Sequence, residues 1–206
     1  MVGNNTTTGS PSINSIASTT SQRAVGFTLP TGSNYTLDNI VLRLRSYRTD
    51  GTGVNNDVPL LQIYADSAKT STNPNGATLQ SVSFGKPESA SDTAAAFTFT
   101  PTSTTFTFLA DTRYWLLVDA TAGSFGWVAT TPSTPPTSDI GVTNITYRQS
   151  NDNGASYTSS PTNSGFVINA TAATPVPFDF DPSLGVAVLG GGWLLRKHLK
   201  KKSTKV

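Results

Sequence analysis

Hydrophobic and polar side chains alternate along much of the chain before residue 174, and this period of two predicts strands. The clearest case is residues 37–47, where Ile40, Leu42 and Leu44 lie on one face and two arginines lie on the other. No stretch before Pro182 has the 3.6-residue period of an amphipathic helix. Further strands are expected at residues 25–29, 60–66, 79–84, 97–99, 106–108, 113–119, 125–129, 140–147 and 166–170.

Short strands at this spacing, with Gly, Pro and Asn turns between them, indicate an all-β protein. We expect an antiparallel two-sheet β-sandwich or jelly roll, followed by a short C-terminal hydrophobic helix. Residues 24–173 are assigned to the sandwich. Residues 1–23, which are rich in Ser, Thr and Asn, are read as a low-complexity arm or a first edge strand.

The strand at residues 113–119 is the most informative, because residues 114–118 are apolar on both faces. A strand of this kind is covered on both sides, so we expect it in the centre of its sheet. Its expected neighbours are residues 106–108 and 125–129, and Trp115 is assigned to the core. Trp127 has two interpretations, either a core residue or an exposed stacking platform for a sugar ring.

From residue 174 the alternation gives way to a different pattern. Residues 174–181 form a proline-broken linker that contains Pro177, Phe178 and Asp179, and residues 182–206 are expected to form the hydrophobic helix with its basic end. The apolar run from Leu184 to Leu195 would be about 18 Å long as a helix, against the ~30 Å hydrocarbon core of a bilayer. We therefore expect a marginal membrane anchor.

The basic cluster after this run predicts the orientation of the tail. Lys and Arg stay on the cytoplasmic side of a membrane, so a cytoplasmic C-terminus and an exported body are expected. The N-terminus has neither the basic nor the apolar region of a secretory signal peptide, so export implies a leader that this chain has lost. The cluster consists of Arg196, Lys197, Lys200, Lys201 and Lys202.

Composition narrows the class of protein further. The chain has 33 Thr, 24 Ser, 17 Gly and 13 Pro, which favours short strands and turns. The formal charge of +2 comes from the tail, because residues 1–195 hold 12 acidic and 8 basic side chains, a net −4. A body of that charge lacks the basic surface needed for nucleic-acid binding. The absence of cysteine excludes disulfides and thiolate metal sites.

Candidate chemistry is sparse. The sole histidine, His198, lies in the tail, so a Ser-His-Asp relay in the body is excluded, and neither an enzyme nor a cofactor is expected. Two loops are weak calcium candidates because they carry carboxylate and amide oxygens: one holds Asp50 and Asp57, the other Asp152. Neither loop has EF-hand spacing, and Asx-turns explain both more simply.

The tail resembles the C-terminal tails of exosortase substrates, the bacterial PEP-CTERM proteins. It has Pro177, Phe178 and Asp179 where that family has Pro-Glu-Pro, which is similar to the variant with Pro-Phe and an acidic residue. The resemblance implies that the membrane and its sorting machinery are partners of the tail. It also implies a final location at the cell surface or in the extracellular matrix.

Five short segments of the body occur in a recognisable order: Gly-Phe-Thr at 26–28, Tyr-Thr-Leu at 35–37, Phe-Thr-Phe-Thr-Pro at 97–101, Thr-Arg-Tyr-Trp-Leu at 112–116 and Gly-Trp at 126–127. Through them the body resembles the bacterial surface domain called choice-of-anchor type R, over about residues 20 to 173. That resemblance implies no enzymatic activity, so we expect an exported, non-enzymatic surface or matrix protein. The alternative is a carbohydrate-binding module that uses Trp127, and an exported hydrolase comes third.

Overall fold

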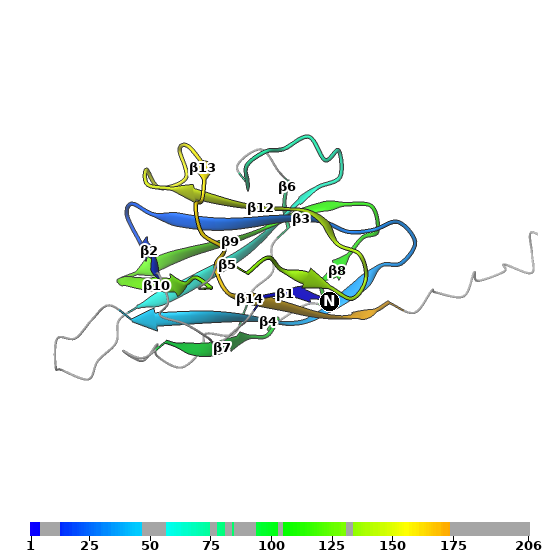
Figure 1. Cartoon of the computed structure of the whole chain (residues 1–206), viewed down its shortest axis with the longest axis horizontal. Helices are drawn as coiled ribbons and strands as arrows, with labels where there is room; N and C mark the ends of the chain where they lie inside the picture. Colours follow the sequence, from blue (N-terminus) through cyan, green and yellow to red (C-terminus); the bar gives the residue numbers. More distant parts are fainter. Residues whose placement is uncertain are drawn as a thin grey trace, which may run out of the picture. The chain divides into compact units, whose positions relative to one another are not determined.

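The alternating segments are strands in the structure, a computed structural model that describes residues 1–4, 13–46, 57–74, 78–80, 84, 94–102, 105–130 and 134–173 (Figure 1). These residues form strands β1 to β14 in two antiparallel sheets, and none of them lies in an α-helix. The all-β, two-sheet prediction is therefore confirmed. Residues 1–173 make one compact unit; the linker, sorting motif and hydrophobic helix predicted for residues 174–206 lie outside the described residues.

Sheet A, the larger of the two, is built around the long strand β4. The period-two prediction for this strand is confirmed, because Ile40, Leu42 and Leu44 are fully buried while Arg45 is exposed. The strand order is β11–β1–β14–β4–β10–β2, and β7 and β8 also pair with β4. The bounds are β1 (Val2–Gly3), β2 (Ile13–Ala17), β4 (Tyr35–Ser46), β7 (Ala95–Phe99), β8 (Thr107–Phe108), β10 (Ser124–Val128), β11 (Thr137–Ser138) and β14 (Phe166–Ala172).

Sheet B has six strands in the order β13–β12–β3–β9–β5–β6, and β9 lies between β3 and β5. The central position predicted for this apolar strand is confirmed. Leu61, Ile63 and Ala65 of β5 alternate toward the interior as expected. The bounds are β3 (Gln22–Thr28), β5 (Val58–Asp66), β6 (Thr78–Gln80), β9 (Arg113–Ala122), β12 (Thr143–Ser150) and β13 (Thr158–Ser159).

The predicted neighbours of β9 were wrong. Residues 107–108 (β8) and 124–128 (β10) belong to sheet A, whereas β9 belongs to sheet B. The reason is that the chain changes sheet at the tight turn of Gly123, which has a positive φ of 69° and directly joins β9 to β10. Closeness in sequence therefore did not mean pairing within one sheet.

The core lies between the two sheets and is rich in aromatic rings. Phe27, Phe106, Phe108 and Tyr114 form a cluster whose ring centroids are 4.9 to 6.2 Å apart, mostly edge to face. Such pairs contribute about 0.5–1.5 kcal/mol each beyond the burial of their area. The chain has no cysteine, so no disulfide adds to this packing.

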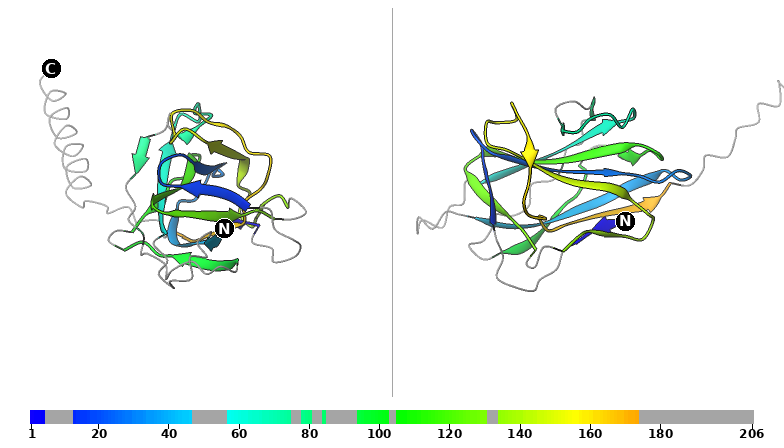
Figure 2. Two further views of the ribbon diagram at one scale, coloured as in Figure 1. Left: turned by 90° about the vertical axis from the view of Figure 1, so that its left-hand side faces the viewer. Right: turned by 45° about the horizontal axis from the view of Figure 1, so that its top comes forward.

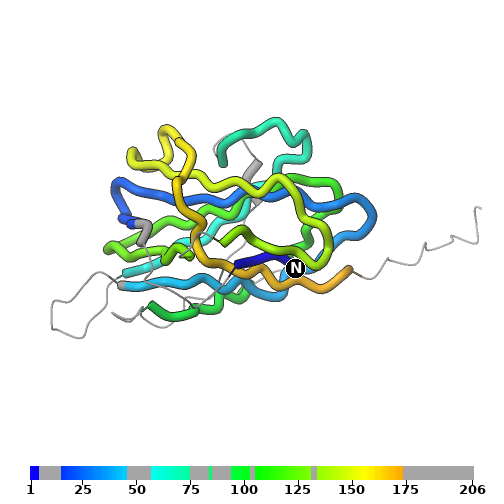
Figure 3. The backbone as a smooth tube through the Cα atoms, in the orientation of Figure 1, coloured from blue at the N-terminus to red at the C-terminus, as the bar shows by residue number. Residues whose placement is uncertain are grey.

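The described residues among the first 23 contribute strands to both sheets. β1 lies between β14 and β11, so it is an interior strand of sheet A (Figure 3), and β2 is the edge strand beside β10. Val2 is 2% exposed, and the Asn4 side chain accepts from the backbone N–H of Phe166 at 3.1 Å and donates to the carbonyl of Thr134 at 2.9 Å. Of the two interpretations of residues 1–23, the described part agrees with strand formation, with β2 at an edge of sheet A and β1 in its interior.

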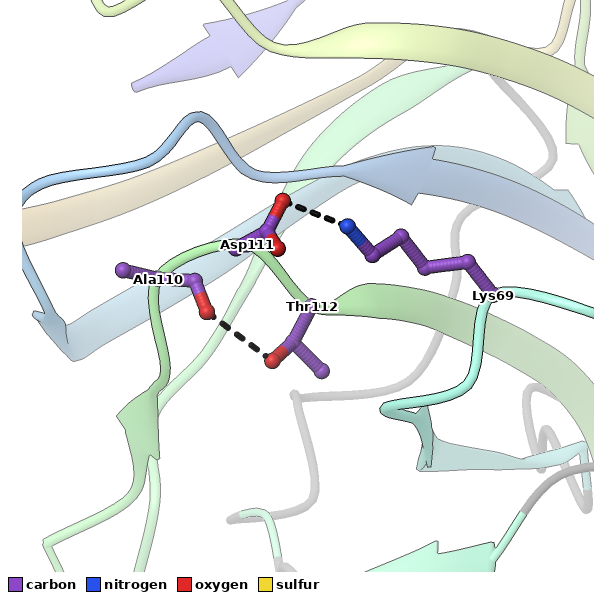
Figure 4. Close-up of polar contacts among 4 residues, drawn as sticks. All are labelled: Lys69, Ala110, Asp111 and Thr112. Carbon is purple, nitrogen blue, oxygen red and sulfur yellow. Dashed lines mark hydrogen bonds and ion pairs between the residues drawn. The ribbon is translucent and has the colours of Figure 1, made fainter.

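Two loops rise over the outer face of sheet B, the face turned away from sheet A (Figures 1 and 2). One comprises residues 67–74, after β5, and the other residues 151–157, between β12 and β13. The first is tied to the turn before β9 by an ion pair of 2.5 Å between Lys69 and Asp111 (Figure 4). Exposed pairs of this kind stabilise little, about 0–1 kcal/mol, so this one positions the loop more than it stabilises the fold.

Candidate functional site

The outer face of sheet B carries a second hydrophobic cluster, separate from the core. Because side chains alternate along β9, Tyr114, Leu116 and Val118 face the core, and Trp115 and Leu117 point outward. Trp115 lies opposite Tyr64 of β5 in the register of the sheet. The outer-face cluster consists of Ala24, Trp115 and Leu117, with Tyr64 and Tyr157 packed against it.

Trp115 is the floor of this cluster. It lies opposite Gly26 of β3, and a Cβ at Gly26 would stand 2.7 Å from the indole ring, so only glycine lets the ring lie against the sheet. The guanidinium carbon of Arg113 sits 4.6 Å from the ring centroid, a cation–π contact. The ring is fully enclosed, and its Nε1–H has no hydrogen-bond acceptor among the described residues.

A chain of hydrogen bonds runs along one side of the cluster. The Tyr157 hydroxyl donates to Gln22 Oε1 at 2.6 Å, and Gln22 Nε2 donates to Asp119 Oδ2 at 2.8 Å. The backbone N–H of Ala120 donates to Asp119 Oδ1 at 2.7 Å. Within the described part of the chain, no cation pairs with this half-buried carboxyl group.

The loop after β12 brings Tyr157 into place. Asn153 and Gly154 both have positive φ, 55° and 85°, and they turn the chain back toward the sheet. The backbone N–H of Asn153 donates to the carbonyl of Thr20 at 2.9 Å, and a Cβ at Gly154 would lie 2.7 Å from Gln22 Oε1. The tight turn at Asn153 and Gly154 thus holds the loop against β3.

The titratable groups of the site influence one another. Burial raises the pKa of Asp119, and hydrogen bonds from the backbone and from Gln22 oppose this rise. Burial also raises the pKa of Tyr64, with the nearby Asp119 carboxyl group as the second cause. The pKa of Tyr157 is raised by burial, then by Tyr64 and Asp119. Both phenols therefore stay protonated at neutral pH, and their O–H groups donate to Gln22 and Gln62.

The opposite end of the same face is basic. Arg113 Nη2 donates to Thr146 Oγ1 at 2.8 Å, which ties β9 across β3 to β12. Arg148 Nε donates to the carbonyl of Thr72 at 3.0 Å, and its Nη1 donates to Ser159 Oγ at 2.6 Å. Arg148 therefore connects the loop of residues 67–74 with β13, and the two loops border the outer-face cluster.

The structure contradicts the stacking-platform interpretation of Trp127. This ring is 0% exposed, lies in the core between the sheets, and donates from Nε1 to the carbonyl of Gly165 at 2.8 Å. An enclosed ring has no face to offer a sugar. Trp115 is likewise buried, but on the outer side of sheet B and not between the sheets.

The two described calcium candidates, Asp57 and Asp152, are engaged in hydrogen bonds with the protein. Asp57 is 2% exposed, and its Oδ1 accepts from the backbone N–H of Ser124 at 2.9 Å. Asp152 accepts from the hydroxyl of Ser156, from the hydroxyl of Ser150 and from the backbone N–H of Ser156, and these hydrogen bonds lower its pKa to about 2. Asp50 lies outside the described residues. Among those described, no group of three or more His, Cys, Asp or Glu side chains is placed to hold a metal ion.

The other predicted site residues lie beyond the described part of the chain. They are the sorting motif Pro177, Phe178 and Asp179, the ends of the apolar run, Leu184 and Leu195, and the basic cluster Arg196, Lys197, Lys200, Lys201 and Lys202. Within the described ranges, the structure contains no helix long and apolar enough to cross a bilayer.

Sequence reasoning missed the residues that surround Trp115. Tyr64, Asp119, Tyr157 and Gln22 come from four separate segments, and nothing in their spacing predicts that they meet. One signal was present: Asp119 follows directly on an apolar run that is covered on both faces, and a carboxyl group at that position needs partners.

No family model, no curated protein and no solved structure matches this chain.

Proposed function

We propose that this chain is an exported, non-enzymatic protein of the cell surface or extracellular matrix, retained or sorted through its C-terminal tail. The observation that carries the proposal is the order of the tail: Pro177-Phe178-Asp179, then the apolar run, then the basic cluster. Each part suits a membrane-sorting signal, and the combination is more specific than any one of them. The partners of the tail are the membrane and its sorting machinery.

The body is consistent with such a role. The described sheets and their hydrogen bonds close within residues 1–173, where Ala173 N–H donates to the carbonyl of Asn34 at 2.9 Å. The compact unit of residues 1–173 therefore ends just before the segment to which we assign the sorting signal. The core reaches its packing without cysteine, which suits a protein that has to stay folded in any redox environment.

Cell fractionation tests this proposal. The full chain and a chain that ends at Thr174 are each expressed with a working leader, and cells, envelope and medium are assayed with an antibody. We expect the full chain in the envelope or matrix and the truncated chain in the medium, folded. A full chain with Gln at residues 196, 197, 200, 201 and 202 should be retained less well, because it lacks the charges that hold the tail's end on the cytoplasmic side. Retention of the truncated chain in the envelope would contradict the role assigned to the tail.

A further inference from the structure

We propose that the outer face of sheet B binds a neutral pyranose unit of a polysaccharide, with Tyr64, Tyr157 and Asp119 as its contacts. The inference builds on the proposed function, since a surface or matrix protein is surrounded by polysaccharide. It replaces the buried Trp127 with a different set of aromatic residues, on the opposite side of sheet B from the core.

The chemistry of the cluster matches the two sides of a sugar ring. A pyranose has an apolar face of C–H groups, which packs on aromatic rings, and an edge of hydroxyls, which needs hydrogen-bond partners. Tyr64 and Tyr157 supply half-buried rings that are not enclosed. Asp119 uses one acceptor position on each oxygen for Ala120 and Gln22, and a carboxylate has about four such positions.

The Tyr64 hydroxyl is the poorly satisfied polar group of the cluster. It has a single long hydrogen bond, 3.5 Å to Gln62 Oε1, so it can still form a hydrogen bond with a ligand. The Trp115 ring is 0% exposed, so it lies beneath the site and does not contact the ligand. The hydroxyls of a sugar can both donate and accept, so they suit this mixture of phenols, amide and carboxyl group.

A flat protein partner fits this face less well. Stable protein interfaces bury roughly 1,200–2,000 Å² around exposed apolar anchors. Among the described residues the one large hydrophobic side chain that is exposed is Leu109, outside the outer-face cluster. The loops of residues 67–74 and 151–157 also lie over this face (Figure 1), so it is not a flat, open surface.

The carboxyl groups select against acidic sugars. Asp119 lies in the site, and Asp152 acts on the same Tyr157 hydroxyl through its charge. A uronic acid would bring like charges together in a partly desolvated place, which is unfavourable. The ligand of this site is therefore a neutral sugar.

The test is calorimetric titration of the purified full chain with cellohexaose and chitohexaose as neutral probes and oligogalacturonate as the acidic probe. We expect binding of at least one neutral probe and weaker or no binding of the acidic one. Tyr64→Ala and Tyr157→Ala should each weaken binding about tenfold or more, as expected for central aromatic contacts. Tyr35→Ala is the matched control, since Tyr35 is equally half-buried but lies in sheet A, and it should bind within about twofold of the unaltered chain.

Asp119→Asn is the variant that keeps the shape of the site and removes its charge, in case an alanine variant fails to fold. It should weaken binding of neutral sugar and relieve the discrimination against oligogalacturonate. Absence of binding to both neutral probes would overturn the proposal, as would unchanged affinity in Asp119→Asn and in every tyrosine variant that folds. Either outcome would leave the fractionation result intact, so a failed sugar site is distinguishable from a failed surface location.

Discussion

The two rows of side chains on β9 are both buried, yet they are buried by different means. The inner row, with Tyr114, Leu116 and Val118, is covered by the apolar faces of two sheets. The outer row, with Trp115 and Leu117, is covered by tyrosine rings and by an arginine laid over the indole. The inner row is thus a packed interior, and the outer row is a covered surface whose cover consists of side chains with polar ends. Burial alone does not tell these two environments apart.

The largest effect is expected from truncation of the inner row. Leu116 is 1% exposed between the sheets, so Leu116→Ala should lower the free energy of unfolding by ~2 to 5 kcal/mol, by loss of transfer energy and creation of a cavity. Leu117→Ala, one residue away in the outer row, is the matched control. It should cost less, since the side chains that cover it can move into the space. Urea denaturation measures both, and equal losses would mean that the two rows do not differ.

A smaller loss in the free energy of unfolding is expected from a change at Gly26, where the Trp115 ring of the outer row lies against the sheet. Gly26→Ala would place a Cβ 2.7 Å from the indole of Trp115, and a ring of that size has no room to give way. Overpacking of this kind costs about 1–3 kcal/mol. In a chain with Trp115→Leu the same Gly26→Ala change should cost little. A double-mutant cycle by urea denaturation checks this, and additive effects would show that the contact is not tight.

The inner and outer environments also show which side-chain positions could be predicted from the sequence and which could not. Period-two alternation correctly placed Ile40, Leu42 and Leu44 inside, because a strand has only two faces and one of them was plainly polar. In β9 both faces are apolar, so burial of Trp115 followed from the sequence but its side of the sheet did not. That choice depends on the tyrosines and on Gly26, which other strands and a loop bring to the indole.

Pairing between strands was harder to predict than the strands themselves. Residues 113–119 and 125–129 were expected to be neighbours, and a turn at Gly123 sends them to different sheets. A crossing between sheets does not change the local hydrophobic periodicity, because side chains alternate between the two faces in the strands both before and after the turn. The outer-face cluster was missed for the same reason, because it depends on which strands of sheet B lie side by side.

Trp115 and Trp127, which are both buried, give a third comparison between the inner and outer environments. Trp127 Nε1 donates to the Gly165 carbonyl at 2.8 Å, whereas Trp115 Nε1 has no acceptor among the described residues. Substitution by Phe removes similar ring volume at both positions but a hydrogen bond at Trp127 alone. Trp127→Phe should therefore cost about 1 kcal/mol more than Trp115→Phe. Paired urea denaturation curves measure the difference, and a greater loss at Trp115 would show that its indole N–H is satisfied.

The smallest expected effect is a difference in pKa between Asp119 and Asp152, two carboxyl groups near the same loop. Burial raises the pKa of Asp119, whereas hydrogen bonds from Ser156 and Ser150 lower that of Asp152 to about 2. An unfolded Asp titrates near about 3.9. The contribution of Asp152 to stability is therefore present above that pH and is lost as the pH falls toward about 2. The contribution of Asp119 to stability changes with pH in the opposite direction: its protonated form favours the fold, and this contribution is lost as the pH rises through its folded pKa.

Carboxyl-carbon NMR measures both pKa values. It should show Asp152 titrating well below Asp119, with Ser156→Ala moving the pKa of Asp152 upward and leaving that of Asp119 unchanged. If the two groups titrated together, the loop and the outer face of sheet B would be equally solvated, and the contrast between a covered surface and an open turn would fail.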